Sequence, residues 1–191
     1  MGYCNSFVKI GIDKEFNYFG IRFLPGIFPS LFNIDASELS NHYERLNTVQ
    51  PCIYNVIQQS KDRCLCLQDL CDELNIYFIK HINKIDKPFD NRFFCALETI
   101  LKSKGSIIIE KDLNDGISSR HLQRLFNFYI GDTAKSFCRI VRFQNLLKID
   151  PSVKLIKSEK SYYDFGYYDQ NHFIKEFKLF YGKTPSKIAA E

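Results

Sequence analysis

Basic and amide side chains recur at helical spacing in two segments of the C-terminal half of the chain. They lie opposite an apolar stripe in each segment, as on an amphipathic helix. Such side chains can bond to the edges of guanine and adenine in the major groove of DNA. On a single helix the same pattern is more typical of an ordinary solvated face. The residues are Arg120, Gln123, Arg124 and Asn127 in the first segment and Asn171, Lys175 and Lys178 in the second.

An internal repeat makes DNA binding a better explanation of this pattern than a solvated helix face. Residues 116–126, followed by Gly131, recur as residues 166–177, followed by Gly182. Each copy predicts a short helix, a glycine turn and a second helix, which is the layout of a helix-turn-helix unit. Two basic copies at fixed spacing favour nucleic-acid binding over a solvated surface. The matching pairs, each 51 residues apart, are His121 with His172, Phe126 with Phe177, and Gly131 with Gly182.

Further motifs extend the match across the C-terminal half. They are residues 117–126 with Gly131 and Lys135, Arg139-Ile-Val-Arg142-Phe, residues 166–173, Glu176-Phe-Lys178 and residues 182–186. From about residue 92 to about residue 189, the chain resembles the DNA-binding domain of AraC/XylS-type bacterial transcription regulators. The resemblance implies a seven-helix domain with two helix-turn-helix units joined by a long helix, residues 133–149. It also implies double-stranded DNA and RNA polymerase as partners, and the function of an activator.

The resemblance also implies roles for individual residues. The implied base contacts come from Arg120, Gln123, Arg124, Gln170, Asn171 and Lys175. The implied phosphate contacts come from Lys135, Arg139, Arg142, Lys178, Thr184 and Ser186. For the cations at 135, 139 and 142, packing of the linking helix is an equally open role. The amides that begin the last helix could hold a phosphate, or Thr184 could be a plain N-cap before Pro185.

Two residues depart from the family pattern. Asp112 and Tyr162 stand where the family usually has alanine, four residues before each turn glycine. They predict a shifted or loosely packed first helix in each unit. This leaves an alternative function: a protein-interaction or regulatory fragment that keeps the fold and has lost specific DNA reading.

The chain as a whole is predicted to be mainly α. Its N-terminal part, residues 1–90, is expected to form a small α+β region. Alternation over residues 7–12 and 16–23, with a charged turn between them, predicts a β-hairpin. Asp35 and Glu38 predict a helix start, and longer helices are expected over residues 52–59 and 62–82. The polar stretch 83–91 is the expected boundary with a domain spanning residues 91–191.

This region also resembles, at residues 19–26 and 36–39, the distal part of a sensor domain found on one branch of these regulators. In that branch β-rich sequence precedes the segment, so we expect the chain to begin inside the sensor domain. A small-molecule effector pocket and a homodimer are the corresponding partner hypotheses. An amphipathic hairpin and plain core packing remain the alternatives. The pocket candidates are Phe16, Tyr18, Phe19, Arg22 and Phe23, and the dimer candidates are Leu67, Leu70, Leu74, Tyr77 and Phe78.

The seven cysteines are an odd number, which fits free, buried thiols in a reducing compartment better than disulfides. A metal or redox site at Cys64, Cys66, Cys71 and His81 is less favoured than structural thiols, because Cys64 and Cys66 point to different sides of the predicted helix.

The two histidines of the repeat, His121 and His172, are expected to pack against or cap the recognition helices. The sequence contains no GxGxxG, GxxxxGK[ST], GxSxG or HExxH motif, and we expect neither an enzyme nor a cofactor.

Charge is distributed unevenly along the 191 residues. Residues 1–90 contain 9 Lys and Arg against 11 Asp and Glu, whereas residues 91–191 contain 17 against 11, so the net +4 conceals a basic C-terminal half. A basic half suits a polyanionic partner. No apolar run is long enough to span a membrane, and a cytoplasmic location is expected.

Overall fold

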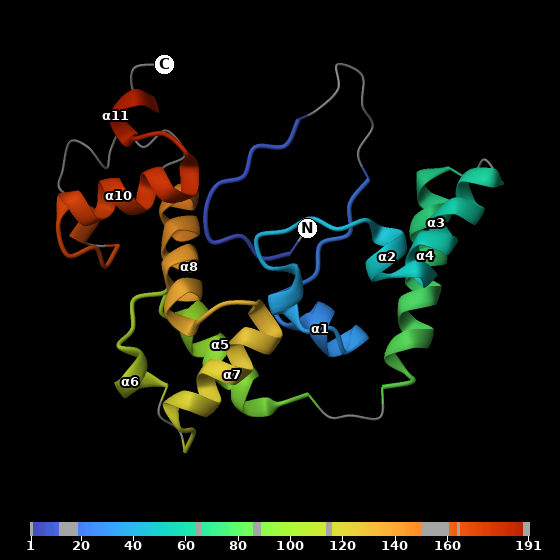
Figure 1. The fold of residues 1–191 in the computed structure, drawn as a ribbon, viewed down its shortest axis with the longest axis horizontal. Coiled ribbons are helices and arrows are strands. Elements are labelled where there is room, and N and C mark those ends of the chain that lie inside the picture. Colours follow the sequence, from blue (N-terminus) through green and yellow to red (C-terminus); the bar gives the residue numbers. More distant parts are fainter. Residues whose placement is uncertain are drawn as a thin grey trace.

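The computed structural model describes residues 2–11, 19–63, 66–85, 89–113, 116–149, 161–163 and 165–188. Within these ranges the chain forms ten α-helices and two short 3-10 helices, and it forms no strand (Figure 1). The prediction of a mainly α protein is therefore confirmed for the described residues.

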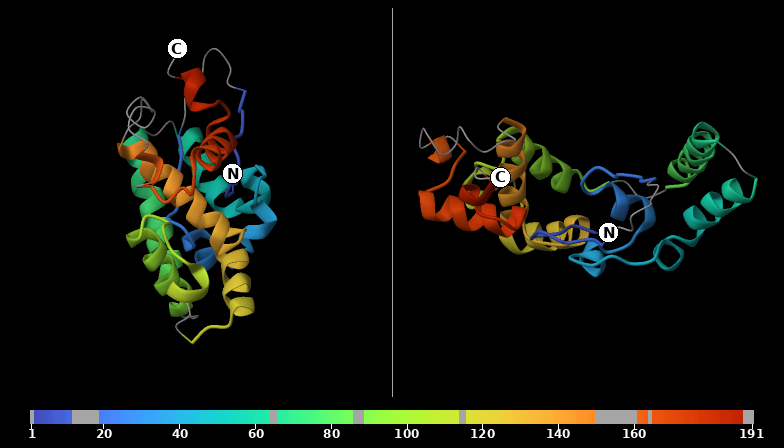
Figure 2. Two further views of the ribbon diagram at one scale, coloured as in Figure 1. Left: turned by 90° about the vertical axis from the view of Figure 1, so that its left-hand side faces the viewer. Right: turned by 90° about the horizontal axis from the view of Figure 1, so that it is seen from above.

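The N-terminal helices form a unit that stands apart from most of the C-terminal helices. Its longest helices, α3 and α4, run side by side as a hairpin at one end of the molecule (Figures 1 and 2). The Phe23 ring meets those of Phe28 and Phe78 at centroid distances of 5.2 and 5.7 Å, which ties α4 to α1. The elements are α1 (Ile27–Phe32), η1 (Ala36–Leu39), α2 (Leu46–Val49), α3 (Pro51–Asp62) and α4 (Leu67–Ile82).

The helix expected over residues 62–82 begins later than predicted. Cys66 is the N-cap of α4, and its backbone N–H donates to Asp69 Oδ2 at 3.1 Å. Hydrogen bonds from Cys66 lower the pKa of the Asp69 carboxyl group. Ser60 Oγ donates to Glu73 Oε2 at 2.5 Å and so joins the two helices of the hairpin. The start at Asp35 is confirmed: its Oδ1 accepts the Ser37 N–H at 2.8 Å and caps η1.

The predicted β-hairpin is not supported. Residues 7–11 and 19–23 contain no strand, and residues 12–18 lie outside the described part of the chain. The backbone groups of the N-terminal segment find partners elsewhere: the Phe7 N–H donates to the Leu179 carbonyl at 2.9 Å, and the Tyr3 carbonyl accepts from the Asn41 N–H at 2.8 Å. Period-two alternation indicates an extended segment but does not identify its neighbour.

The C-terminal helices enclose two aromatic-rich cores that share α8. Ala134, Phe137 and Val141 of α8 belong to the first core, whereas Phe143 and Leu146 belong to the second. The sequence pattern of residues 152–163 predicts a further helix. Residues 150–160 lie outside the described part of the chain, and η2 covers the described end of this stretch. The elements are α5 (Asn91–Lys102), α6 (Ile109–Asp112), α7 (Ser119–Ile130), α8 (Ala134–Ile149), η2 (Ser161–Tyr163), α10 (Gln170–Tyr181) and α11 (Pro185–Ile188).

Asp112 and Tyr162 are accommodated without loss of either core. Tyr162 is buried in the second core beside Phe173. Asp112 is exposed, and its Oδ2 accepts the Ile108 N–H at 2.7 Å at the start of α6. That helix is nevertheless a single turn, Ile109–Asp112.

The expectation that the cysteines are buried is correct for Cys138 and wrong for three others. Burial raises the pKa of the Cys138 thiol to about 11. Cys52, Cys66 and Cys95 are exposed, because each lies on a polar helix surface or at a helix start. The described cysteines are free thiols.

Candidate nucleic-acid interface

The second helix of the first repeat, α7, presents its polar side to solvent. Leu122, Phe126 and Ile130 are buried in the first core. On the opposite side, the predicted Arg120, Gln123 and Arg124 are exposed, as is Asn127. Because this face has no protein core against it, its donors are available to a ligand.

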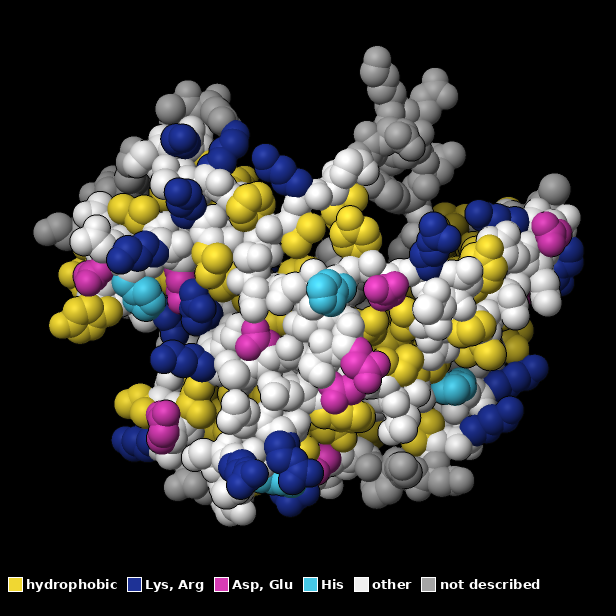
Figure 3. Space-filling model, viewed as in Figure 1, with side chains coloured by type: hydrophobic (Ala, Val, Ile, Leu, Met, Phe, Trp, Pro, Cys, Tyr) yellow, Lys and Arg dark blue, Asp and Glu magenta, His cyan; other side chains and the backbone are white. Residues whose placement is uncertain are grey.

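The equivalent helix of the second repeat, α10, has the same arrangement. Phe173 and Phe177 are buried in the second core. The predicted Gln170, Asn171 and Lys175 are exposed, and Lys178 is also exposed. Lys and Arg side chains gather over α10 and α11 and again at the lower edge of the molecule over α7 (Figure 3).

Both helices begin and end in the same way. Ser118 Oγ accepts the His121 N–H at 3.3 Å, and Asp169 Oδ1 accepts the His172 N–H at 2.7 Å. Each helix ends at a glycine with a left-handed backbone, Gly131 at φ 93° and Gly182 at φ 84°, a conformation that favours glycine. Residues close in the sequence therefore determine both limits of each helix.

The two arginines of α8 pack against the protein. Arg139 Nε donates to Glu176 Oε1 at 2.5 Å, and its guanidinium lies over the Phe180 ring. Arg142 donates to the Gly105 carbonyl at 3.2 Å and lies over the Tyr167 ring. These contacts favour a packing role for Arg139 and Arg142 over the phosphate contacts that the resemblance implied. Lys135, by contrast, is exposed.

A buried polar cluster beneath α10 was missed by the sequence analysis. Glu176 is only 2% exposed, and His172 Nε2 lies 3.5 Å from the oxygen that binds Arg139. Burial, with the nearby Glu176 carboxylate, raises the pKa of Tyr167 well above its usual range. A signal was present: Glu176 lies three residues after Phe173, on the apolar side of the helix.

The last predicted contacts lie at α11. Thr184 is half-buried and its carbonyl accepts the Lys187 N–H at 3.0 Å, whereas Ser186 is exposed. The described part of α11 is one turn, Pro185–Ile188.

Comparison with known families agrees with this geometry. Residues 115–191, from the glycine turn of the first unit to α11 and beyond, match the family model of a helix-turn-helix domain of the AraC type. The chain carries the AraC-type helix-turn-helix domain of a DNA-binding transcription regulator. The resemblance to AraC/XylS-type regulators is thereby confirmed. Residues 1–45 match a domain of unknown function, DUF6597. No curated protein and no solved structure matched the chain.

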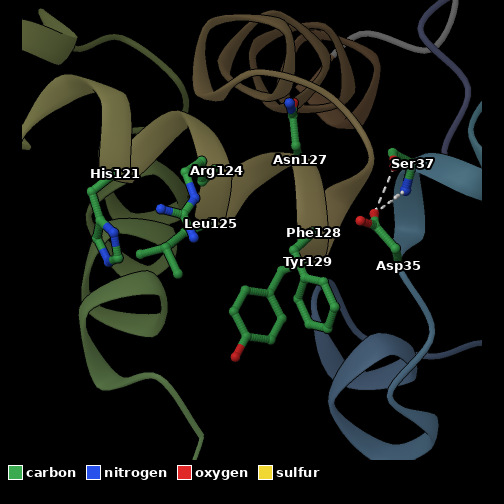
Figure 4. A pocket seen from close by; sticks show the side chains of 8 residues that line it. All are labelled: Asp35, Ser37, His121, Arg124, Leu125, Asn127, Phe128 and Tyr129. Carbon is green, nitrogen blue, oxygen red and sulfur yellow. Dashed lines mark hydrogen bonds between the residues drawn. The ribbon is translucent and has the colours of Figure 1, made fainter.

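A pocket of about 450 Å³ lies between α7 of the AraC-type domain and the N-terminal segment. Ser37 of η1 and Asp35, its N-cap, form one side, and side chains of α7 that include Arg124 and Asn127 form the other (Figure 4). One predicted base-reading residue, Arg124, therefore lines the same pocket as Asp35 and Ser37, which belong to the segment that matches the domain of unknown function.

The candidate residues of the predicted effector pocket, dimer contact and metal site lie in the N-terminal part of the chain. Phe23 packs in the aromatic cluster of α1 and α4, Arg22 is exposed, and Leu74 is buried. His81 Nε2 is hydrogen-bonded to the Leu31 carbonyl at 2.9 Å, while Cys64 lies outside the described residues.

The described residues hold no group of three or more His, Cys, Asp or Glu placed to bind a metal ion. In the same part of the chain, none of the helices combines the length and the apolar character needed to cross a membrane.

Proposed function

We propose that this protein is a sequence-specific transcription activator that inserts α7 and α10 into successive major grooves on one face of DNA. The main supporting observation is that two helices with equivalent N-caps, equivalent glycines at their C-terminal ends and exposed polar faces are joined by one helix shared between two cores. Successive major grooves on one face lie about 34 Å apart.

In this proposal the two helices divide sequence reading between them. Direct contacts to base edges come from Arg120, Gln123, Arg124, Gln170, Asn171 and Lys175, all exposed. Contacts to phosphate come from Lys135, Lys178, Thr184 and Ser186, and supply much of the salt-dependent affinity. Arg139 and Arg142 orient the second unit through Glu176 and Gly105.

The partners follow from the same proposal. An activator of this class acts on RNA polymerase at the promoter in the cytoplasm. We also propose that the protein forms a homodimer, binds a small-molecule effector and catalyses no reaction. The proposed domains are residues 1–90 and residues 91–191. The exposed apolar side chains of α4, Ile76, Ile79 and Ile82, add a second set of candidates for the dimer contact.

The test is selection of genomic fragments by the full chain, followed by gel shift of the enriched fragments against bulk DNA at two salt concentrations. The proposal expects at least one fragment to outcompete bulk DNA at physiological salt, since specific complexes exceed non-specific ones by roughly 10³-fold or more. Retardation that bulk DNA removes equally at both salt concentrations would contradict it. That result would favour the alternative function as a protein-interaction or regulatory fragment.

A further inference from the structure

The turn before α10 contains one residue that the first unit lacks. In the first unit the buried Ile117 is followed directly by the N-cap Ser118. In the second unit the buried Tyr167 and the N-cap Asp169 are separated by Tyr168. The two recognition helices therefore begin alike, but only α10 is preceded by an additional side chain.

This additional side chain is an aromatic ring in solvent. Tyr168 is 85% exposed, the largest exposed fraction among the large hydrophobic side chains in the described part of the chain. Its neighbour Tyr167 is 2% exposed and belongs to the second core, under the guanidinium of Arg142. Tyr168 therefore lies between a residue fixed in the core and a residue that caps the helix, while its own ring stays outside the core.

The backbone around Tyr168 is held by hydrogen bonds. Its N–H donates to His172 Nδ1 at 3.4 Å, and Asp169 Oδ1 accepts the His172 N–H at 2.7 Å. Earlier in the turn, the Gly166 N–H donates to the Tyr163 carbonyl at 2.8 Å. A ligand that packs on the ring of Tyr168 therefore restricts mainly two side-chain torsions, so the entropic cost of the contact is small.

The position of Tyr168 indicates what can pack on it. A single exposed hydrophobic side chain is ordinary on a protein surface. Tyr168, however, lies two residues before Gln170 and three before Asn171, which are exposed at the start of the proposed recognition helix. Recognition helices present their N-terminal residues to base edges in the major groove. The apolar group that base edges offer there is the C5 methyl group of thymine, and an aromatic ring can pack on it.

We propose that Tyr168 reads a thymine methyl group in the half-site bound by α10. The inference rests on the proposed function and adds a specificity-determining residue to the polar base contacts of that helix. The first unit has no residue at the equivalent place, so this thymine preference belongs to one half-site alone. Burial of one methyl group corresponds to a change in affinity of about 4-fold.

The test removes the methyl group and the ring separately. Deoxyuridine replaces each thymine of a selected DNA site in turn, which deletes only the methyl group, and gel shift compares the wild-type full chain with Tyr168→Ala. At one position uracil should weaken wild-type binding about 4-fold and should not weaken Tyr168→Ala further, because both changes delete the same contact. The selected sites should share a thymine at that position. Tyr168→Phe keeps the ring and should bind as the wild type does.

Tyr43→Ala is the matched control, because Tyr43 is 74% exposed and lies outside the residues matched by the AraC-type family model. It should show the same effect of uracil as the wild type, and thermal melting establishes that each variant is folded. Equal effects of uracil on the wild type and on Tyr168→Ala at every position would overturn the inference, as would selected sites that share no thymine.

A loss of affinity in Tyr168→Phe as large as in Tyr168→Ala would also overturn the inference, because it would show that the hydroxyl group, and not the ring, makes the contact. Absence of specific binding by the wild type would instead reject the proposed function, so the two failures are distinct.

Discussion

Arg139 Nε donates to Glu176 Oε1 at 2.5 Å, and this ion pair joins α8 to the buried side of α10. The two partners differ in their access to solvent: the Glu176 side chain is 2% exposed and that of Arg139 is 35% exposed. The pair therefore sets the position of the second recognition helix relative to the helix that both cores share.

The unequal exposure predicts unequal costs of substitution. Arg139→Leu leaves a buried carboxylate without its main charge partner and should lower the free energy of unfolding by about 3 kcal/mol. Glu176→Leu leaves an arginine that can turn to water, and should cost about 1 kcal/mol. Urea unfolding measures both. The double variant should recover much of the loss, because no charge is then buried. A larger loss for Glu176→Leu than for Arg139→Leu would contradict this account.

Replacement of Arg124 tests base reading by α7. Its exposed guanidinium lies on the polar face, and Arg124→Ala should cost about 1 to 3 kcal/mol of binding free energy and relax specificity at one base step. Gel shift against fragments substituted at each position measures both effects. Lys61→Ala, an exposed cation on α3, is the control and should bind as the wild type does. An equal loss by Arg124→Ala on cognate and random DNA would show that Arg124 contacts phosphate instead.

Lys135 should act through charge alone. It is exposed at the start of α8, so Lys135→Ala should weaken binding to cognate and random DNA by similar factors. It should also reduce the slope of log K against log salt by about 1, as expected for one lost phosphate contact. Affinity measured at several salt concentrations provides the slope. An unchanged slope would remove Lys135 from the interface.

Asp90 should make the stability of α5 depend on pH. Its side chain caps the helix and bonds Arg92, whose side-chain hydrogen bonds lower the pKa of this carboxyl group. The stabilisation is present above the unfolded pKa of about 3.9 and is lost as pH falls through the lower folded pKa. Asp90→Ala should therefore cost about 1 kcal/mol at neutral pH and progressively less in acid. Thermal unfolding at several pH values measures the difference, and an equal cost at neutral and acid pH would contradict it.

Features encoded by neighbouring residues could be predicted from the sequence. The two recognition helices depend on a capping side chain, an apolar stripe and a glycine that ends the helix, all within one segment. In the structure Ser118 and Asp169 are the caps, and Gly131 and Gly182 end the helices.

Features that depend on distant residues could not be predicted in this way. Alternation around Phe7 does not reveal that its backbone partner is Leu179. The partner of Arg139 is 37 residues away, and a charged side chain on an apolar stripe is identified as buried only once its counter-ion is known. The break before α4 depends on capping by Cys66, a residue type that is uncommon in that role.

The most direct test of the central claim measures the affinity of the full chain for one selected DNA site and for a version with about 5 extra base pairs between its two half-sites. About half a helical turn of B-DNA moves one half-site to the opposite face. Because α8 is shared by both cores, the two recognition helices cannot follow it, and affinity should fall to that of a single half-site. Equal affinity for the two spacings would contradict the claim that both helices read DNA together.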